Sequence, residues 1–240
     1  DLESAGFVSS TVGRGTFVLK NGNGAEGAGP HDELQPLDRL YLPLMQREDA
    51  INLSLNEPLT AGTDERLRDA IAALTAKHDL NALAHYQPAQ GQVAHRKAGA
   101  AWLEELGVEA SAEDVYAVSG GQTALMTIFL GLARPGDTVL TEELTWPGAL
   151  SVGRLTGIRL KPVAVDAQGM VPAAFEEACV SWRPRFVYTM PTLHNPTTAT
   201  AGLARRKEIA AIAKAHNVLI VEDDAYGFLI EPRATPYFEL

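Results

Sequence analysis

The 240-residue sequence has very little cysteine, no excess of positive charge and no long apolar run. Its single cysteine, Cys179, excludes an internal disulfide and favours a reducing compartment, for which we expect the cytoplasm. The formal net charge is −10, so the chain as a whole is poorly suited to bind nucleic acid through its electrostatic field. The apolar runs are too short to cross a bilayer, and we expect neither a signal peptide nor a membrane association. The six histidines show no metal-ligand spacing, which predicts no metal site.

The composition that remains is typical of a globular protein. Apolar residues make up 46% of the chain and charged residues 21%, which is enough to build a sizeable core. The length allows one large domain or two small ones. Neither Asp1 nor Leu240 resembles a natural terminus, so we expect a fragment of a longer protein.

The first 36 residues predict a small β-hairpin followed by a linker. Residues 7–12 and 16–18 are β-prone, and Gly13-Arg14-Gly15 between them is typical of a tight turn that carries one cation. Residues 19–36 are rich in glycine and poor in apolar side chains, which predicts a flexible linker and a domain boundary. We therefore expect three parts, namely a partial domain at 1–18, the linker at 19–36 and a main domain at 37–240.

Strands and helices alternate along the main domain. The expected strands cover residues 51–55, 114–118, 138–141, 158–165, 185–190 and 218–221, and the expected helices cover residues 64–77, 93–106, 124–133 and 203–215. Residues 175–180, around Cys179, also favour a helix, in which the cysteine packs. This alternation predicts an α/β fold, a mostly parallel sheet with helices on both faces.

The loop after residue 118 could hold an anion. Ser119-Gly120-Gly121-Gln122-Thr123 stands between an expected strand and a helix that is apolar nearly all round. Glycines let the backbone approach a ligand, and the free N–H groups at a helix start attract phosphate. The alternative is a helix that is merely capped by Ser119.

The stretch at residues 218–228 brings acids to the end of a buried strand. Four apolar residues run directly into Glu222, Asp223 and Asp224, and Tyr226 follows. Ligands of open parallel sheets bind at the carboxyl ends of the strands, so an acid here would face a ligand. Strand alternation should turn Asp223 toward that ligand and its two neighbours away. The alternative is a solvated acidic turn.

Two further loops, at residues 145–148 and 194–197, complete a set of four at the strand ends. Together the four loops offer an anion cradle, a large aromatic face, an amide, a carboxylate and a phenol. Pyridoxal phosphate needs each of these, because its phosphate, ring, ring nitrogen and phenolic oxygen must all be held, and an aspartate partner makes the ring an electron sink. His194 lies in one of the loops, where a packing or solvent role is favoured over contact with the ligand.

From about residue 50 to residue 240 the sequence resembles the large domain of fold-type-I aminotransferases of class I/II. The resemblance implies a pyridoxal-5′-phosphate site in which Gly120, Gly121 and Gln122 bind the phosphate, Trp146 stacks on the ring, Asn195 and Tyr226 hydrogen-bond the ring O3′, and Asp223 pairs with the ring nitrogen. Tyr86, in a "Y.P..G" motif, would reach the cofactor phosphate or the substrate of the neighbouring subunit in a homodimer.

The sequence also departs from this family. Thr198 stands where the family usually has glycine after "NPT", and Asn56-Glu57-Pro58 lacks the glycine that often opens the substrate loop. The family's Schiff-base lysine and its substrate-carboxylate arginine are expected beyond Leu240, so no catalytic residue is assigned in this chain. Lys207 and Lys214 are expected to be solvated helix positions.

Residues 1–18 resemble the wing of the winged helix-turn-helix domain in GntR-type bacterial repressors, with the pattern "LE..G(F/Y)V....G.GTFV". This resemblance implies that Arg14 contacts the DNA backbone; the alternative is a hairpin without that role. A wing, a linker and an aminotransferase-like domain on one chain resemble the MocR subfamily of transcription regulators. That subfamily implies a regulator that binds pyridoxal phosphate, contacts DNA through its winged-helix domain and senses a small amino-acid or amine effector. The alternatives are an aminotransferase acting on an amino acid and a 2-oxo acid and, more remotely, a carbon–sulfur lyase of the same fold.

Overall fold

The computed structural model describes residues 8–11, 15–18, 56, 62–77, 81 and 85–240, and the chain divides into two units, residues 1–67 and 68–240. In the first unit, β1 (Val8–Thr11) and β2 (Gly15–Val18) pair antiparallel, with Val8 opposite Val18. The two β-prone runs therefore form the expected hairpin. Arg14, the linker at 19–36 and the strand expected at 51–55 lie outside the described residues.

Helix α2 (Thr63–Lys77) crosses the boundary between the units. Asp64 and Glu65 lie in its first turn, where carboxylates stabilise the positive end of the helix dipole. None of the helices in the described part of the chain is long and apolar enough to span a membrane.

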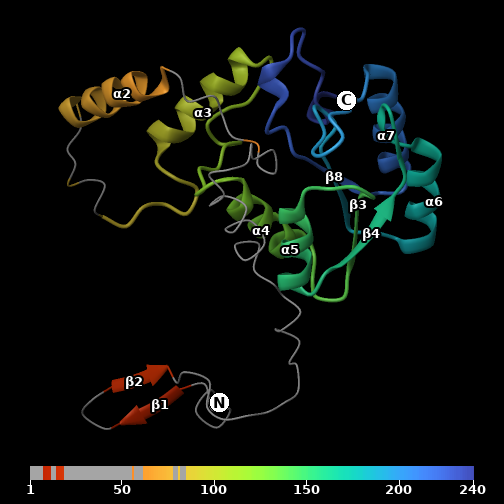
Figure 1. The fold of residues 1–240 in the computed structure, drawn as a ribbon, viewed down its shortest axis with the longest axis horizontal. Coiled ribbons are helices and arrows are strands. Elements are labelled where there is room, and N and C mark those ends of the chain that lie inside the picture. Colours follow the sequence, from red (N-terminus) through yellow and green to blue (C-terminus); the bar gives the residue numbers. More distant parts are fainter. Residues whose placement is uncertain (1–7, 12–14, 19–55, 57–61, 78–80, 82–84) are drawn as a thin grey trace, which may run out of the picture. The chain divides into compact units, whose positions relative to one another are not determined.

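A parallel sheet forms the centre of the second unit (Figure 1). Its four strands among the described residues lie in the order β4 (Arg159–Val163), β3 (Thr138–Glu142), β7 (Phe186–Thr189) and β8 (Leu219–Glu222). Leu140 pairs with Val187, and Thr189 pairs with Glu222. The expected parallel sheet is therefore confirmed, and all four strands end at the same edge.

Helices cover both faces of this sheet (Figure 1). One face packs against α4 (Gly121–Leu132) and α5 (Pro147–Thr156), and the other against α6 (Pro172–Trp182) and α7 (Leu203–Ala215). Successive residues of a strand point to opposite faces of the sheet. Phe186 and Tyr188 pack in the core under α4 and α5, and Val187 packs in the second core, under α6 and α7. Burial on both faces explains the apolar character of β7, whereas β8 lies at the edge of the described sheet and leaves Leu219 56% exposed. Cys179 is buried in the second core, as expected of a packing residue.

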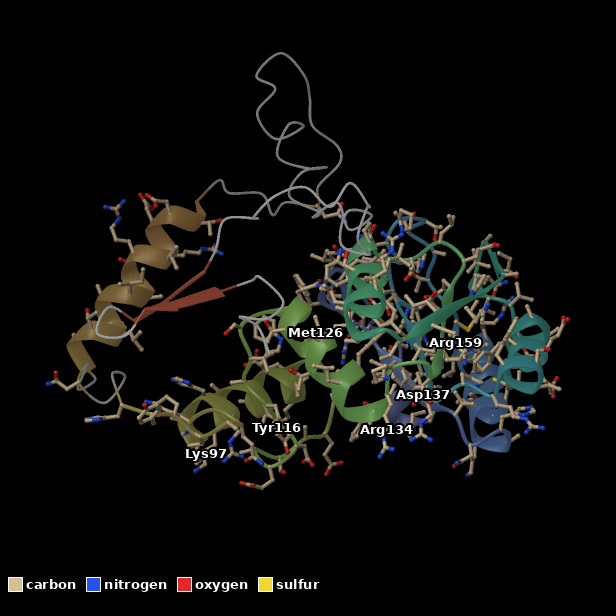
Figure 2. The ribbon with its side chains drawn as sticks, turned by 90° about the horizontal axis from the view of Figure 1, so that it is seen from below. Lys97, Tyr116, Met126, Arg134, Asp137 and Arg159 are labelled. Carbon is tan, nitrogen blue, oxygen red and sulfur yellow. The ribbon has the colours of Figure 1, made fainter. Side chains whose placement is uncertain are left out.

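Smaller elements complete the unit. They are α3 (Val93–Glu105), a short antiparallel pair of β5 (Val165–Asp166) and β6 (Gly169–Met170), and 3-10 turns at Gly227–Leu229 and Tyr237–Glu239. At the edge where β3 and β4 begin lie Arg134, Asp137 and Arg159 (Figure 2). Charged side chains at this edge are separated from the candidate site, because the site loops follow the opposite ends of the strands.

The strand expected at 114–118 is wrong. The N–H and the hydroxyl of Ser111 both donate to Asp114 Oδ2, at 2.9 and 2.6 Å, and this closes a turn. Ala117 N–H donates to the carbonyl of Gln90 (2.9 Å), which lies in a loop. The segment forms no ladder with the four strands of the described sheet, and β-propensity without a ladder partner does not make a strand.

Candidate functional site

The loop before α4 presents free backbone donors. Helix α4 begins at Gly121, earlier than the expected Ala124, and its first hydrogen bond runs from Ala124 N–H to Gly120 O (3.1 Å). The N–H groups of residues 121–123 therefore have no acceptor within the helix. A Cβ at Gly120 or Gly121 would meet nothing within 4 Å, so the space in front of these donors is open. Gly120 caps the helix with φ 95° and no side-chain cap is present, so the alternative of a cap by Ser119 is wrong.

Trp146 is held beside this helix start. It stands at the N-cap of α5, where Pro147 opens the helix. Gln122 Nε2 donates to the carbonyl of Gly148 (3.3 Å) and so ties the start of α4 to the start of α5. A Cβ at Gly148 would lie 2.3 Å from the Trp146 ring, so only glycine allows this approach. Trp146 and Tyr226 both pack, half-buried, against the core under α4 and α5.

Asp223 is fixed at the end of β8 by bonds that run across the sheet. Its N–H donates to the carbonyl of Thr189 (2.9 Å), and its Oδ1 accepts the N–H of Ala225 (3.2 Å). The hydroxyl of Tyr188 donates to Oδ2 (2.7 Å). Tyr188 is fully buried, and burial raises the pKa of its phenol, so it remains a neutral donor. Tyr188 was not predicted from the sequence. The feature that could have indicated it is a tyrosine hydroxyl within a buried strand, because such a hydroxyl needs a hydrogen-bond partner.

The three neighbouring carboxylates have different partners, and strand alternation correctly separates Glu222 from Asp223. Glu222 pairs with Arg206 of α7 (2.8 Å), and Asp224 pairs with Arg233. Asp223 instead bonds Tyr188, which belongs to the core on the α4 and α5 face. Of the three, Asp223 is therefore the acid that faces the side where Trp146 lies.

Arg206 is a fully buried cation that was not predicted from the sequence. Besides Glu222, it donates to the carbonyls of Ala201 (2.9 Å) and Pro191 (3.1 Å) and to the hydroxyl of Thr192 (2.6 Å). The loop after β7 is thereby tied to the end of β8. Burial raises the pKa of Glu222, although Arg206 acts in the opposite direction.

Asn195 follows a buried histidine in the loop after β7. Asn195 itself is half-buried, whereas the His194 ring is 2% exposed, in agreement with the packing role that was favoured for it. His194 Nε2 lies 4.0 Å from Glu142 Oε2 at the end of β3. Burial raises the pKa of Glu142 to about 7 and lowers the pKa of His194.

A cleft of about 1520 Å³ lies along α7 and β8 and reaches the end of β8. Gly121 at the start of α4 lines it together with Glu222, Asp223 and Asp224. The predicted cofactor residues Trp146, Asn195 and Tyr226 do not line it. Lys207 and Lys214 line it as well, and both are exposed, as expected of solvated helix positions. The cleft brings together a predicted phosphate-binding residue and the predicted acid.

Two further positions that the sequence singled out are Tyr86 and Thr198. Tyr86 is fully exposed, and its role toward a neighbouring subunit remains a prediction. Thr198 has φ 59°, in the left-handed region that a β-branched residue rarely adopts. Glycine adopts this conformation freely, which explains why a glycine is usual at this place in the resembled family.

The chain matches the family model of aminotransferase class I and II over residues 48–236. Among solved structures it resembles Pyrococcus horikoshii kynurenine aminotransferase in complex with PMP, with a TM-score of 0.73 and 28% identity over 83% of this chain and 52% of that one.

Two curated relatives differ in how much of the chain they match. An aromatic amino acid aminotransferase of Schizosaccharomyces pombe is 38% identical over 48% of this chain and 25% of its own length. The uncharacterized HTH-type transcriptional regulator YisV of Bacillus subtilis is 28% identical over 95% of this chain and 49% of its own length. The chain thus spans half or less of the length of both relatives. The family match over residues 48–236 shows that it belongs to the aminotransferase class I and II family.

Proposed function

We propose that the chain is the pyridoxal-phosphate-binding, aminotransferase-like part of a MocR-type transcription regulator. The observation that carries this proposal is the match to YisV, which aligns with 95% of the chain and so extends well before residue 48, where the aminotransferase family match begins. The extent of the match alone does not exclude an enzyme, because an L-tyrosine:2-oxoglutarate aminotransferase of Tapinella panuoides aligns with 88% of the chain. The hairpin of β1 and β2 supports it, since the proposed wing needs two antiparallel strands there. In this proposal the full-length protein is a homodimer that contacts DNA, with Arg14 at the phosphate backbone, and responds to a small amino acid or amine.

Pyridoxal phosphate is the cofactor that the family and its PMP-bound neighbour support. The residues present fit it: the open N–H groups at Gly121 and Gln122 suit a phosphate, and the Trp146 face suits a ring. Asp223 suits a protonated ring nitrogen, because Tyr188 and Ala225 already fix its orientation. Asn195 and Tyr226 are proposed to bond the phenolic oxygen. When bound, the cofactor supplies a ring that accepts electrons from the attached amine.

Asp223 gives the sharpest test of this site. Pyridoxal phosphate is titrated into the purified chain, and binding is followed by tryptophan fluorescence and by the absorption of the cofactor. A hydrogen bond to a charged group contributes about 1.5–3 kcal/mol, so Asp223→Ala should raise the Kd by roughly 10- to 100-fold. Asp224→Asn is the matched control, because it lies on the same loop and keeps its bond to Arg233. A parental Kd for Asp223→Ala would show that the site is wrongly assigned.

A second experiment separates the regulator from the enzyme. The protein as encoded in its genome is mixed with the DNA upstream of its own gene, and retardation of that DNA is measured with and without pyridoxal phosphate. Retardation that depends on the cofactor supports the regulator. The alternative is an aminotransferase that acts on an amino acid and a 2-oxo acid, as the S. pombe relative's name suggests. Steady turnover of aromatic amino acids with 2-oxoglutarate and no retardation of DNA would favour that enzyme.

A further inference from the structure

Two buried polar atoms face each other beneath the Asn195 loop. Glu142 Oε2 and His194 Nε2 are 4.0 Å apart, and each side chain is 2% exposed. Neither atom meets the geometry of a hydrogen bond with a described residue, although the carbonyl of Leu144 lies close enough to the His194 ring to act as an acceptor. An unpaired buried polar group is costly, and two of them placed face to face indicate a shared interaction.

Glu142 is anchored on its other side. Its Oε1 accepts a short hydrogen bond from the hydroxyl of Thr189 and a bond from Met190 N–H (3.2 Å). These bonds link the end of β3 to the end of β7 and fix the carboxyl plane, so Oε2 is the oxygen left to face His194. The acid therefore holds the base of the loop that begins after Met190.

The contacts of His194 Nδ1 are compatible with a neutral ring that carries its hydrogen on Nε2. Thr197 N–H donates to Nδ1 (3.4 Å), and the Thr197 hydroxyl lies 2.8 Å from the same nitrogen. Because Nδ1 accepts from the backbone, a neutral ring carries its hydrogen on Nε2, the atom that faces Glu142. A closing movement of about 1 Å would bring Nε2 and Oε2 within hydrogen-bond distance.

Other charged and titratable groups surround the pair. Asp223, directly after β8, raises the pKa of Glu142, and the charge of Glu142 in turn raises the pKa of the Tyr188 and Tyr237 phenols. The backbone carbonyl of Leu144 favours a charged His194, and burial opposes it. Burial raises the pKa of Glu142 to about 7, so its proton is exchanged within the neutral range.

We propose that Glu142 and His194 form a pair that takes up and releases one proton, and that they act as positioning residues that set the orientation of Asn195. When Glu142 is ionised, Nε2–H donates to Oε2, and Nδ1 accepts the Thr197 N–H. When Glu142 takes up one proton at Oε2, that O–H donates to Nε2, and the ring hydrogen moves to Nδ1 and donates to the Thr197 hydroxyl. The Thr197 N–H then loses its acceptor, two residues from Asn195. The consequence for the cofactor rests on the proposed function, whereas the proton exchange does not.

The exchange can be measured without cofactor. The chain is labelled with ¹⁵N-histidine, and long-range ¹H–¹⁵N spectra are recorded from pH 5 to pH 9, with His194 assigned by its loss in His194→Gln. We expect the ring hydrogen of His194 to move from Nε2 at high pH to Nδ1 at low pH. The side-chain amide of Asn195, assigned through Asn195→Ser, should shift with the same midpoint. In Glu142→Gln neither signal should change over this range.

Controls keep the test decisive. Glu176→Gln removes a carboxylate 3.9 Å from a different histidine, His216, and should leave the His194 signals unchanged. Should Glu142→Gln fail to fold, Thr197→Val at an exposed position removes the acceptor for Nδ1–H and should lower the midpoint. Protonation of both His194 nitrogens in the parent and in Glu142→Gln alike would overturn the proposal. If the proton exchange occurs but Asn195→Ser binds pyridoxal phosphate with parental affinity, the proposed contact of Asn195 with the cofactor is wrong. The proposed proton exchange between Glu142 and His194 is then still supported.

Discussion

Removing the buried charge of Arg206 tests whether the candidate site depends on the contacts that join the two loops beside it. The guanidinium is fully buried and bonds Glu222, the carbonyls of Pro191 and Ala201, and the hydroxyl of Thr192. Arg206→Met keeps much of the volume and removes every donor. The carboxylate of Glu222, whose side chain is 12% exposed, then keeps the N–H of Tyr237 (2.7 Å) as its remaining bond among those described.

The loss of unfolding free energy depends on the charge that Arg206→Met leaves unpaired, the carboxylate of Glu222. Breaking a buried ion pair by removing one partner costs about 3–5 kcal/mol of unfolding free energy, because an uncompensated charge stays behind. Glu222 can escape part of this cost by taking up a proton, since burial already raises its pKa. We therefore expect Arg206→Met to lose about 3 kcal/mol at pH 8 and less at pH 5. Arg206→Lys keeps the charge but cannot reproduce the fork of donors, so it should fall between the parent and Arg206→Met.

A double-mutant cycle in urea separates the charge from the other bonds. Glu222→Gln is combined with Arg206→Met, and the free energy of unfolding is measured for all four proteins at both pH values. The double variant should recover part of the loss, because the stranded charge is gone, but the carbonyls of Pro191 and Ala201 still lack their donor. A loss below about 1 kcal/mol in Arg206→Met, equal at both pH values, would refute the reasoning.

Three further predictions concern single side chains. Thr198→Gly should raise the free energy of unfolding by about 1 kcal/mol in thermal melts, because φ 59° strains a β-branched residue, whereas Thr198→Val should bring no gain. Burial raises the pKa of Cys179 to about 11, so an aromatic disulfide reagent should modify it at pH 8 only after urea unfolds the chain. The pKa of Glu142 rises from 4.5 to about 7, so its contribution is complete below pH 4.5 and is lost as the pH rises toward 7. Relative to Glu142→Gln, the parent should lose about 3 kcal/mol over that range, and parallel stability profiles would contradict this.

Local sequence patterns predicted the parts of the fold that depend on neighbours along the chain. The apolar run before Asp223 correctly predicted a strand, but the expectation that it is buried on both faces is wrong: β8 is the edge strand of the described sheet, and Leu219 is 56% exposed. The period of two correctly predicted that Glu222 would turn to the side opposite Asp223. The same reasoning failed at residues 114–118. Those residues have strand-like side chains, but whether a strand forms there depends on a partner distant in the sequence.

The residues that the sequence did not reveal share one physical property. Tyr188, Glu142 and Arg206 are polar residues whose hydrogen-bond partners lie 35, 47 and 16 residues away along the chain, respectively. The short periods of helices and strands therefore could not reveal these pairs. Each of the three residues was hidden because it occupies a position that packing alone would give to an apolar residue.

Burial nevertheless makes such residues identifiable in principle. A tyrosine or glutamate at the end of a strand covered on both faces must find a partner at that edge, because a polar group left unpaired there costs about 1–3 kcal/mol. In a parallel sheet that partner comes from the next strand end, which is also where a ligand binds. Tyr188 lies one residue before the end of β7, and Asp223 directly follows β8, so each constrains the other. The hydrogen bond from the buried Tyr188 phenol also fixes the Asp223 carboxylate in the absence of a ligand. Buried polar groups of the sheet therefore lie directly behind the candidate site, because they orient the residue that would contact the ligand.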